Sequence, residues 1–422
     1  MKSKTLLAAS SLIALSVSFG SQAVAADKAA VLETYKKIAH AGYEDSLITA
    51  KALQKAVEAL VANPSEETLA AARTAWVESR APYQQTEVYR FGNAIVDDWE
   101  GKVNAWPLDE GLIDYVDGGY YGEESDENAL FRANVIANPV FQLGGETINA
   151  SVISKELLAE TLHEVDDVEA NVATGYHAIE FLLWGQDTNG NGAGAGDRPY
   201  TDFDVNNCTG GSCERRNHYL LTATDLLIDD LQWMTEQWTA NGSASKALDE
   251  EGENGGLITM LTGMGSLSYG ELAGERMKLG LLLNDPEEEH DCFSDNTHYS
   301  HFYDAKGIQN VFAGSYTRVD GSVVSGPGLK DLLPKAEASE LGGALDDTMS
   351  KMQVLVDFAE KKGQSYDQLI GEGNTEGNAA VQAAIDALLV QTKGIERATS
   401  ALKLDAIEFE GSDSLDNPSA VQ

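Results

Sequence analysis

The sequence predicts an all-α protein made of two helical-bundle-like halves. Apolar residues recur at steps of three and four over long stretches, strand-like alternation is scarce, and Gly- and Asp-rich segments separate the periodic stretches. Amphipathic helices bury their apolar faces against one another, which is the architecture of helical bundles. Each half also contains a long irregular loop, over residues 92–127 and 284–328.

The first 25 residues are typical of a secretory signal peptide. Two lysines precede an apolar stretch that ends near Phe19, and the small residues Ala-Val-Ala at 23–25 suit a cleavage site. This stretch, and every later one, falls short of the roughly 20 apolar residues that a transmembrane helix needs. We therefore expect no membrane span and a location in the periplasm or cell envelope.

Three helical patterns form the N-terminal half, to which we assign residues 26–205. Ser65 favours a helix start, because its hydroxyl can accept a hydrogen bond from a free backbone N–H group of the first turn. Pro82 should kink the second helix, since proline lacks the N–H group that the helix needs. A Gly-, Asn- and Asp-rich loop over 185–213 marks the domain boundary. The three patterns cover residues 27–62, 66–91 and 154–184.

Four further helical patterns form the C-terminal half, residues 206–410, and a flexible tail over 411–422 follows. In each half the second helix carries a Glu and an Arg near its end, and an acidic loop with an aromatic residue comes after it. This loose match suggests an internal duplication. The four patterns cover residues 214–241, 257–283, 329–362 and 376–403.

Acidic residues outnumber basic ones by 68 to 29, which gives a net charge of −39. Such a chain repels nucleic-acid phosphates and anionic lipid, and it attracts cations. A solvated acidic surface that aids solubility is the favoured explanation of the overall charge. The sequence shows no phosphate-binding Gly loop, no Gly-x-Ser-x-Gly elbow and no basic aromatic patch, so nucleotide chemistry, serine hydrolysis and nucleic-acid binding are poorly supported.

Two motifs lie in the loop between the halves. Cys208 and Cys213 can close a small disulfide in an oxidising compartment, whereas a zinc site is less expected because no second Cys pair follows. Residues 187–192 resemble the opening of a calcium loop, but Arg198 stands where that loop needs a bidentate Glu. We therefore interpret residues 187–192 as a flexible loop.

The most informative stretch is residues 175–185, Gly-Tyr-His-Ala-Ile-Glu-Phe-Leu-Leu-Trp-Gly. His177 and Glu180 lie three apart on a helix and therefore share a face. An imidazole and a carboxylate at this spacing occur in metal-binding helical bundles. The alternative is a histidine paired with its own helix neighbour, since His-x-x-Glu is short and common.

Two residues cannot fill a metal site, so further ligands must come from elsewhere. Residues 78–110 offer several acids together with arginines that can orient them. Residues 271–301 offer acids and three of the seven histidines, namely His290, His298 and His301. Solvation explains an acidic loop as well, but it does not require the aromatic residues that are mixed into this one.

The stretch Gly-Tyr-His177-Ala-Ile-Glu180 resembles the Gly-x-His-x-x-Glu signature of the imelysin family, also called the iron-regulated protein A family. The likeness continues in other blocks and covers most of residues 30–320 in order. These blocks are residues 76–90, 104–115, 274–277 and 287–298.

The resemblance implies an all-helical fold of two bundle-like halves, with a site at their interface, in a periplasmic or cell-envelope protein tied to iron uptake. It carries His177 and Glu180 over as metal ligands, and block position adds Glu87. Block position also suggests residues that orient the ligands or bind beside them. These are Arg80, Asp109, Glu275, Arg276, Asp295 and His298.

We therefore predict a metal-binding protein that takes part in iron acquisition, with iron favoured and zinc as the second choice. Its expected partners are the metal ion, or a small metal chelate, and envelope iron-uptake components. The alternative is an imelysin-type zinc metallopeptidase, which needs about three protein ligands, an open position and a general base. In the favoured arrangement, residues 271–301 reach His177; otherwise each half is self-contained and residues 287–301 only cover a bundle end.

Overall fold

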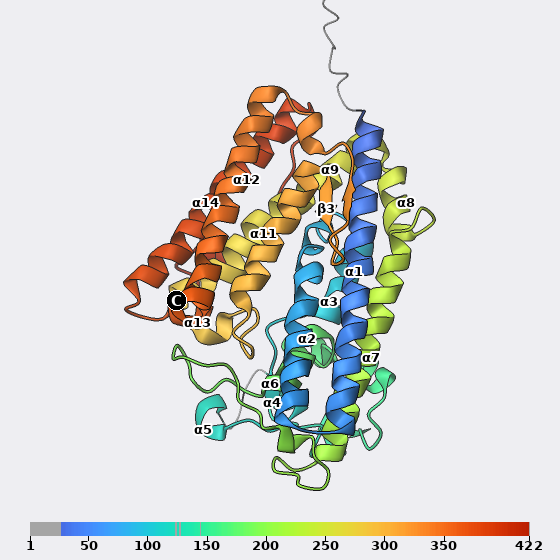
Figure 1. The fold of residues 1–422 in the computed structure, drawn as a ribbon, viewed down its shortest axis with the longest axis vertical. Helices are drawn as coiled ribbons and strands as arrows, with labels where there is room; N and C mark the ends of the chain where they lie inside the picture. Colours follow the sequence, from blue (N-terminus) through green and yellow to red (C-terminus); the bar gives the residue numbers. More distant parts are fainter. Residues whose placement is uncertain (1–26, 123–124, 126–127, 144, 422) are drawn as a thin grey trace, which may run out of the picture.

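The computed structural model describes residues 27–122, 125, 128–143 and 145–421. The predicted signal peptide, residues 1–25, lies outside these residues. The described chain is all-α, as the sequence predicts, and its short strands form two isolated antiparallel hairpins. The long helices run broadly along the longest axis of the molecule, and loops gather at one end (Figure 1).

The first group of long helices surrounds α1 (Lys28–Ala62), which packs along α2 (Glu66–Gln84) and α7 (Cys213–Gln237). The predicted cap is present, because the Ser65 hydroxyl accepts a hydrogen bond from the Thr68 N–H group. α7 belongs to the predicted C-terminal half, yet it packs against helices of the first. The boundary near residue 205 and the internal duplication stay predictions.

Helix α2 is shorter than predicted. It ends two residues after Pro82, and the chain then turns through the 3₁₀ segment η1 (Glu87–Tyr89) instead of continuing to Phe91. A proline in the last turn removes one helix hydrogen bond and crowds the preceding turn, so the helix stops there.

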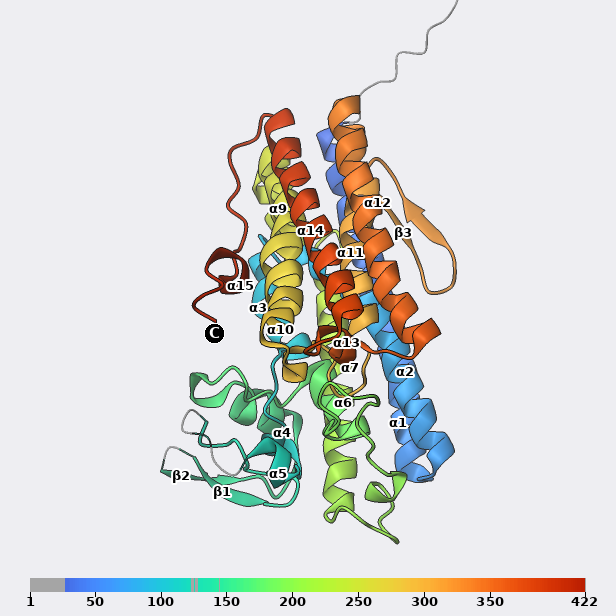
Figure 2. The same ribbon diagram turned by 90° about the vertical axis from the view of Figure 1, so that its left-hand side faces the viewer.

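The second group of helices packs around α14. Figure 2 shows α9, α14, α12 and α11 running in the same general direction, and α11 also contacts α2 of the first group. One helix of this group continues without a break from α-helical through π-helical into α-helical geometry. The members are α9 (Gly252–Ser266), π-helical η5 (Leu267–Leu279), α10 (Gly280–Leu283), α11 (Thr297–Ala313), α12 (Lys335–Asp357), π-helical η8 (Phe358–Lys362) and α14 (Thr375–Ala401).

The predicted long helix over 154–184 is wrong. It consists of the π-helical turn η2 (Leu157–Leu162), the 3₁₀ turn η3 (Val165–Asp167) and helix α6 (Gly175–Trp184), with irregular chain between them. Apolar residues continue at helical spacing across the break because the irregular chain is buried too, as at Val172.

The irregular segments contain helices that the sequence did not predict. Within 92–127, α3 begins after Asn93, whose side chain accepts a hydrogen bond from the Ile95 N–H group. Within 284–328, α11 buries polar residues such as His301 and Asp304 beside its apolar ones, which hides its periodicity. The shorter elements are α3 (Ala94–Asn104), α4 (Glu110–Ile113), α5 (Gly118–Tyr121), β1 (Val140–Leu143), β2 (Glu146–Asn149), η4 (Tyr200–Asp202), α8 (Ser243–Glu250), η6 (Pro286–Glu288), β3 (Ser315–Thr317), β4 (Val323–Ser325), η7 (Leu329–Asp331), α13 (Tyr366–Ile370) and α15 (Asp413–Asp416).

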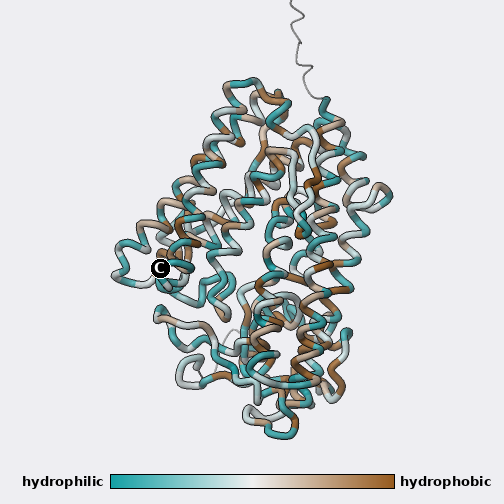
Figure 3. The backbone as a smooth tube through the Cα atoms, in the orientation of Figure 1, coloured by the Kyte–Doolittle hydropathy of each residue, from teal (hydrophilic) through white to brown (hydrophobic). Residues whose placement is uncertain are grey.

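Hydrophilic and hydrophobic residues alternate along the helices (Figure 3), so each long helix has one face for the core and one for the surface. No helix among the described residues is long and apolar enough to cross a membrane. Cys208 and Cys213 form a disulfide. At the C-terminus, α15 packs against η5, and Ser414 donates a hydrogen bond to the Gly274 carbonyl. Flexibility of residues 411–422 stays a prediction.

Candidate metal centre

Helix α6 carries the first two residues of the site. Every residue of α6 is buried, because the helix lies inside the fold with α2, α3 and α7 packed against it. His177 and Glu180 share one face of α6, and His177 Nδ1 lies 3.0 Å from Glu180 Oε2. The pair therefore sits in the interior, away from bulk water.

A glycine fixes the start of α6. Gly175 has a φ of +78°, a left-handed conformation that favours glycine. A Cβ atom at this position would lie 2.4 Å from the Val103 carbonyl oxygen. The close approach of α6 to the end of α3, and with it the position of His177, depends on this residue.

Glu180 is held by the segment that precedes α11. Its Oε1 accepts hydrogen bonds from the Ser294 backbone N–H, at 3.0 Å, and from the Ser294 hydroxyl, at 2.7 Å. Its Oε2 faces His177, so both oxygens of this fully buried carboxylate are engaged. A segment more than a hundred positions away in the sequence is thereby fastened to α6.

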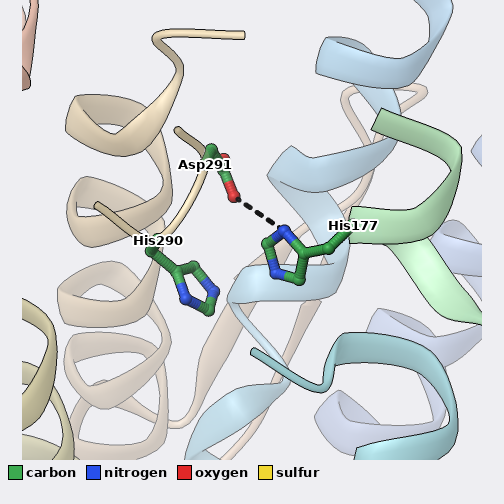
Figure 4. Close-up of side chains that lie close together, drawn as sticks. All are labelled: His177, His290 and Asp291. Carbon is green, nitrogen blue, oxygen red and sulfur yellow. Dashed lines mark ion pairs between the residues drawn. The ribbon is translucent and has the colours of Figure 1, made fainter. Parts of the chain in front are cut away.

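The same segment brings a second histidine and an aspartate to His177 (Figure 4). The rings of His177 and His290 lie 4.8 Å apart, and Asp291 Oδ1 lies 4.0 Å from His177 Nδ1. One potential ligand atom from each of the three residues lies within 4.8 Å of the other two. In the described part of the chain, no other group of three His, Cys, Asp or Glu residues converges in this way.

Arg80, Asn296 and the α11 residue Ser300 hold Asp291 in place. Arg80 donates to Asp291 Oδ1 at 2.9 Å and to Asn104 Oδ1 at 2.7 Å, so its planar guanidinium joins α3 to the candidate centre. Asp291 Oδ2 accepts hydrogen bonds from Asn296 and Ser300. Arg80 therefore lies beside a carboxylate, while its role at a metal stays a prediction.

Burial sets the protonation of the three residues. It lowers the pKa of His177 to about 3, with a further contribution from Arg80, and it lowers the pKa of His290 far below its usual range. Burial alone raises the pKa of Asp291, but Arg80, His177 and the hydrogen bonds from Ser300 and Asn296 together outweigh it, and the pKa falls below its ordinary value. At neutral pH the centre offers two neutral imidazoles and one carboxylate, which are the states that bind metal ions.

The imidazole nitrogens also lack partners. His177 Nε2 and both ring nitrogens of His290 are buried and have no hydrogen bond. Buried polar atoms are usually satisfied, so unpaired nitrogens in the interior require an explanation. A metal ion would accept the lone pairs of His177 Nε2 and of the unprotonated ring nitrogen of His290, and the residues present therefore fit the metal that the sequence predicts.

Glu87 and Arg276 meet each other and not His177. Arg276 Nη2 lies 2.8 Å from Glu87 Oε2, and the same guanidinium pairs with Glu271 at 2.7 Å and with Asp304 at 3.0 Å. This second buried charge cluster already gives Glu87 a cationic partner. We therefore leave Glu87 out of the ligand set that we propose.

Asp109 lies beside the centre without joining the three ligands. It accepts hydrogen bonds from Asn128 and Tyr121 and lines a pocket of ≈290 Å³. Trp106 also lines this pocket, and its ring lies 5.7 Å from that of His290. Trp106 therefore lies between this pocket and the candidate centre.

The other three predicted residues do not join the centre either. His298 is buried on α11, and its Nε2 lies 4.0 Å from Glu360. Asp295 is partly buried with Oδ1 unpaired, and Glu275 is half-buried on η5.

Two residues of the centre, His290 and Asp291, were not predicted as site residues. Both lie in the stretch 271–301, which the sequence indicates as a source of ligands, but the prediction names their neighbours Asp295 and His298. The signal was present as an adjacent His-Asp pair between acidic and aromatic residues. Nothing in the spacing distinguishes this pair, because irregular chain decides which way each side chain points.

Comparison with known proteins identifies the family. The imelysin family model matches residues 39–395, which include every residue of the centre. The chain belongs to the imelysin family. The resemblance to this family that the sequence predicts is confirmed by the match.

The fold of this imelysin-family protein is shared with a crystal structure described as an iron-regulated protein A precursor from Parabacteroides distasonis. The two chains are 18% identical, the TM-score is 0.62, and the match covers 91% of this chain and 97% of the other. At this identity the likeness establishes the common fold. None of the curated proteins matches the chain.

Proposed function

We propose that this imelysin-family protein binds one transition-metal ion through His177, His290 and Asp291, with iron favoured and zinc as the second choice. The observation that supports it is the convergence of three buried ligand atoms within 4.8 Å. Two imidazoles and one carboxylate form the ligand set of many non-haem ferrous sites, and also of zinc sites with two histidines and one carboxylate. The ion would take the lone pairs that are otherwise unpaired.

Glu180 serves mainly to orient His177 in this proposal. A carboxylate that accepts a hydrogen bond from one ring nitrogen fixes the ring and makes the other nitrogen a better ligand. With Glu180 beside Nδ1, the unpaired Nε2 of His177 is free for the ion. Direct ligation by Glu180, as the signature suggests, is the alternative.

We further propose that the protein acts in the periplasm or cell envelope in iron acquisition. The structural neighbour is described as an iron-regulated protein A precursor, which agrees with iron as the ion. The net charge of −39 favours cations over anionic partners such as nucleic acids. A small metal chelate is the alternative cargo, and envelope iron-uptake components are the expected protein partners.

A zinc metallopeptidase is the second candidate, because its ligand set is compatible with the same three residues. Such an enzyme needs a general base beside a metal-bound water. Glu180 has both oxygens engaged and is fully buried. This favours a binding protein over an enzyme.

Metal counting tests the proposal. Protein freed of metal and then loaded with Fe²⁺ without oxygen, or with Zn²⁺, should retain one ion per chain by elemental analysis. His290→Ala, and His177→Ala combined with Glu180→Ala, should lose most of it. His218→Ala removes an exposed histidine of α7 and should retain the wild-type content.

Full metal content in His290→Ala would refute the centre as described here. Cleavage of an unfolded protein substrate by the zinc-loaded wild type, abolished by chelator and by His177→Ala, would favour the peptidase instead.

A further inference from the structure

A second group of acidic residues lies close to the metal centre and has no role in it. Glu110, Asp187, Glu287, Glu289 and Asp367 line a cavity of ≈10 Å³. No Lys, Arg or His lines this cavity. A volume of this size has room for about one water-sized particle.

Two of these carboxylates are buried and have an unpaired oxygen. Glu289 is 1% exposed and its Oε1 has no hydrogen bond; Asp367 is 2% exposed and its Oδ2 has none. The second oxygen of each is engaged, by Thr297 at 3.4 Å and by Ser365 at 2.5 Å. A buried oxygen without a partner is costly. A cation in the cavity would supply a partner to both.

Three of these acids come from three separate segments. Asp187 lies in the loop after α6, Glu289 lies before α11, and Asp367 lies in α13. Asn191 donates to the Asp367 backbone oxygen at 2.9 Å, which fastens the loop after α6 to α13. Two of the three segments are therefore already joined beside the cavity.

Residues 187–192, which resemble the opening of a calcium loop, contribute one acid to this cavity. Arg198, at the position of the missing Glu ligand, pairs with Asp114 at 2.8 Å and with Asp202 at 3.1 Å. The loop alone therefore cannot enclose an ion. It does present Asp187 to acids that come from the rest of the chain.

The chemistry of the donors favours a hard cation. All of the candidate ligand groups are carboxylates, which suit Ca²⁺ better than ions that prefer nitrogen or sulfur. Burial raises the pKa of Asp367 to about 6, and the nearby charge of Asp187 adds to the rise. A divalent cation would remove this repulsion.

We propose that Asp187, Glu289 and Asp367 bind a hard divalent cation, best matched by Ca²⁺, at a site separate from the histidine centre. The carboxylate oxygens converge less closely than the atoms of the histidine centre, so binding draws the three segments together. The ion thereby stabilises the chain around His290, which directly follows Glu289. This inference goes beyond metal binding at His177.

Calcium binding to the full-length protein tests the proposal. Chelator-treated protein is dialysed against ⁴⁵Ca²⁺ in about 0.15 M NaCl, which screens diffuse attraction to the acidic surface. The wild type should bind one tight ion. Asp367→Asn, which is isosteric, and Glu289→Gln should each weaken binding about tenfold or more, since calcium affinity follows the number of charged ligands.

Two controls distinguish binding at the acidic site from binding elsewhere. Glu58→Gln combined with Asp405→Asn removes two exposed acids far from any cavity residue in sequence and should bind Ca²⁺ like the wild type. Asp367→Asn should keep its iron or zinc at the histidine centre, and His177→Ala should keep its Ca²⁺.

Three results would overturn the calcium site. In the first, the wild type binds Ca²⁺ no more tightly than Asp367→Asn. In the second, the exposed double variant loses as much Ca²⁺ as Asp367→Asn does. In the third, Ca²⁺ disappears together with the transition metal in His177→Ala. Because Asp367 lies outside the segment that carries His290, a folding defect of Glu289→Gln leaves the test intact.

Discussion

Arg80 shows how a buried charge is compensated by several groups at once. Its guanidinium pairs with Asp291, donates to Asn104, and lies over the rings of Tyr83 and Tyr176 at 5.7 and 5.0 Å. A lysine could not reproduce this, since its ammonium group lacks the planar fork and stacks less well. Arg80 therefore fixes Asp291, a proposed metal ligand, and packs the core in the same place.

Replacing Arg80 with methionine should destabilise the protein by about 3–5 kcal/mol, because Asp291 would be left as an uncompensated buried charge. Urea unfolding in the presence of chelator measures this loss. The control is Arg397→Met, which breaks an exposed ion pair with Glu340 and should cost less than about 1 kcal/mol. Equal losses in the two variants would contradict the role of Arg80.

His301 offers a test of buried neutral histidines outside the proposed ligand set. It is fully buried, its ring lies 4.9 Å from that of Tyr366, and neither nitrogen has a partner. Burial lowers its pKa to about 3, with a contribution from Arg276. The unfolded chain therefore binds a proton where the folded chain does not. The stability from this residue is complete above pH 6.5 and is lost as the pH falls toward 3.

Replacing His301 with phenylalanine should remove this pH dependence. Between pH 7.5 and 4.5 the wild type should lose about 2–3 kcal/mol more unfolding free energy than His301→Phe does. Denaturant unfolding of chelator-treated protein at the two pH values measures the difference. His218→Phe, at an exposed position, should follow the wild type; identical pH dependence in wild type and His301→Phe would rule out the buried neutral state.

At the scale of elements, helices with one apolar face were predictable and helices with a polar interior were not. The long pattern over 376–403 corresponds to α14, which has a continuous buried face. α11 was missed, because its inward face carries His298, His301 and Asp304. In the sequence these polar residues indicate an exposed face, and they are buried only because other parts of the chain pack over them.

In the candidate site too, only the residues on a regular helix could be predicted from the sequence. His177 and Glu180 were predictable because helical spacing fixes their relationship. His290 and Asp291 were not, because they lie in irregular chain whose direction depends on long-range contacts such as the one between Ser294 and Glu180. Local spacing carries information about neighbours on one helix, and very little about partners from another segment.

The start of α6 should be sensitive to a single methyl group. Gly175→Ala should lower the free energy of unfolding by about 1–2 kcal/mol, because alanine is strained in the left-handed backbone conformation. The added Cβ would also clash with the Val103 carbonyl oxygen. Gly363→Ala is the matched control, because Gly363 has a φ of +65° and nothing lies within 4 Å of an added Cβ. Thermal unfolding and metal content should both be lower for Gly175→Ala than for Gly363→Ala. Equal behaviour would show that α6 tolerates displacement.

At the scale of the whole molecule, the net charge of −39 should oppose compaction. Raising NaCl from about 0.02 to 0.5 M shortens the screening length several-fold and should raise the unfolding temperature of chelator-treated protein. KCl should act like NaCl, since screening does not depend on the identity of the monovalent ion. An unchanged or lower unfolding temperature would show that repulsion between the acidic residues does not destabilise the folded chain.

In the proposed metal centre, the separation in sequence between its two parts determines when an ion can be bound. Glu180 and Ser294, which join these parts, are separated by 114 positions. An unfinished or extended chain has no centre, so capture follows folding. For a chain that folds only after export, the ion is selected from the metals at the destination and not from those at the place of synthesis. Identical sequences folded in two compartments would then carry different ions.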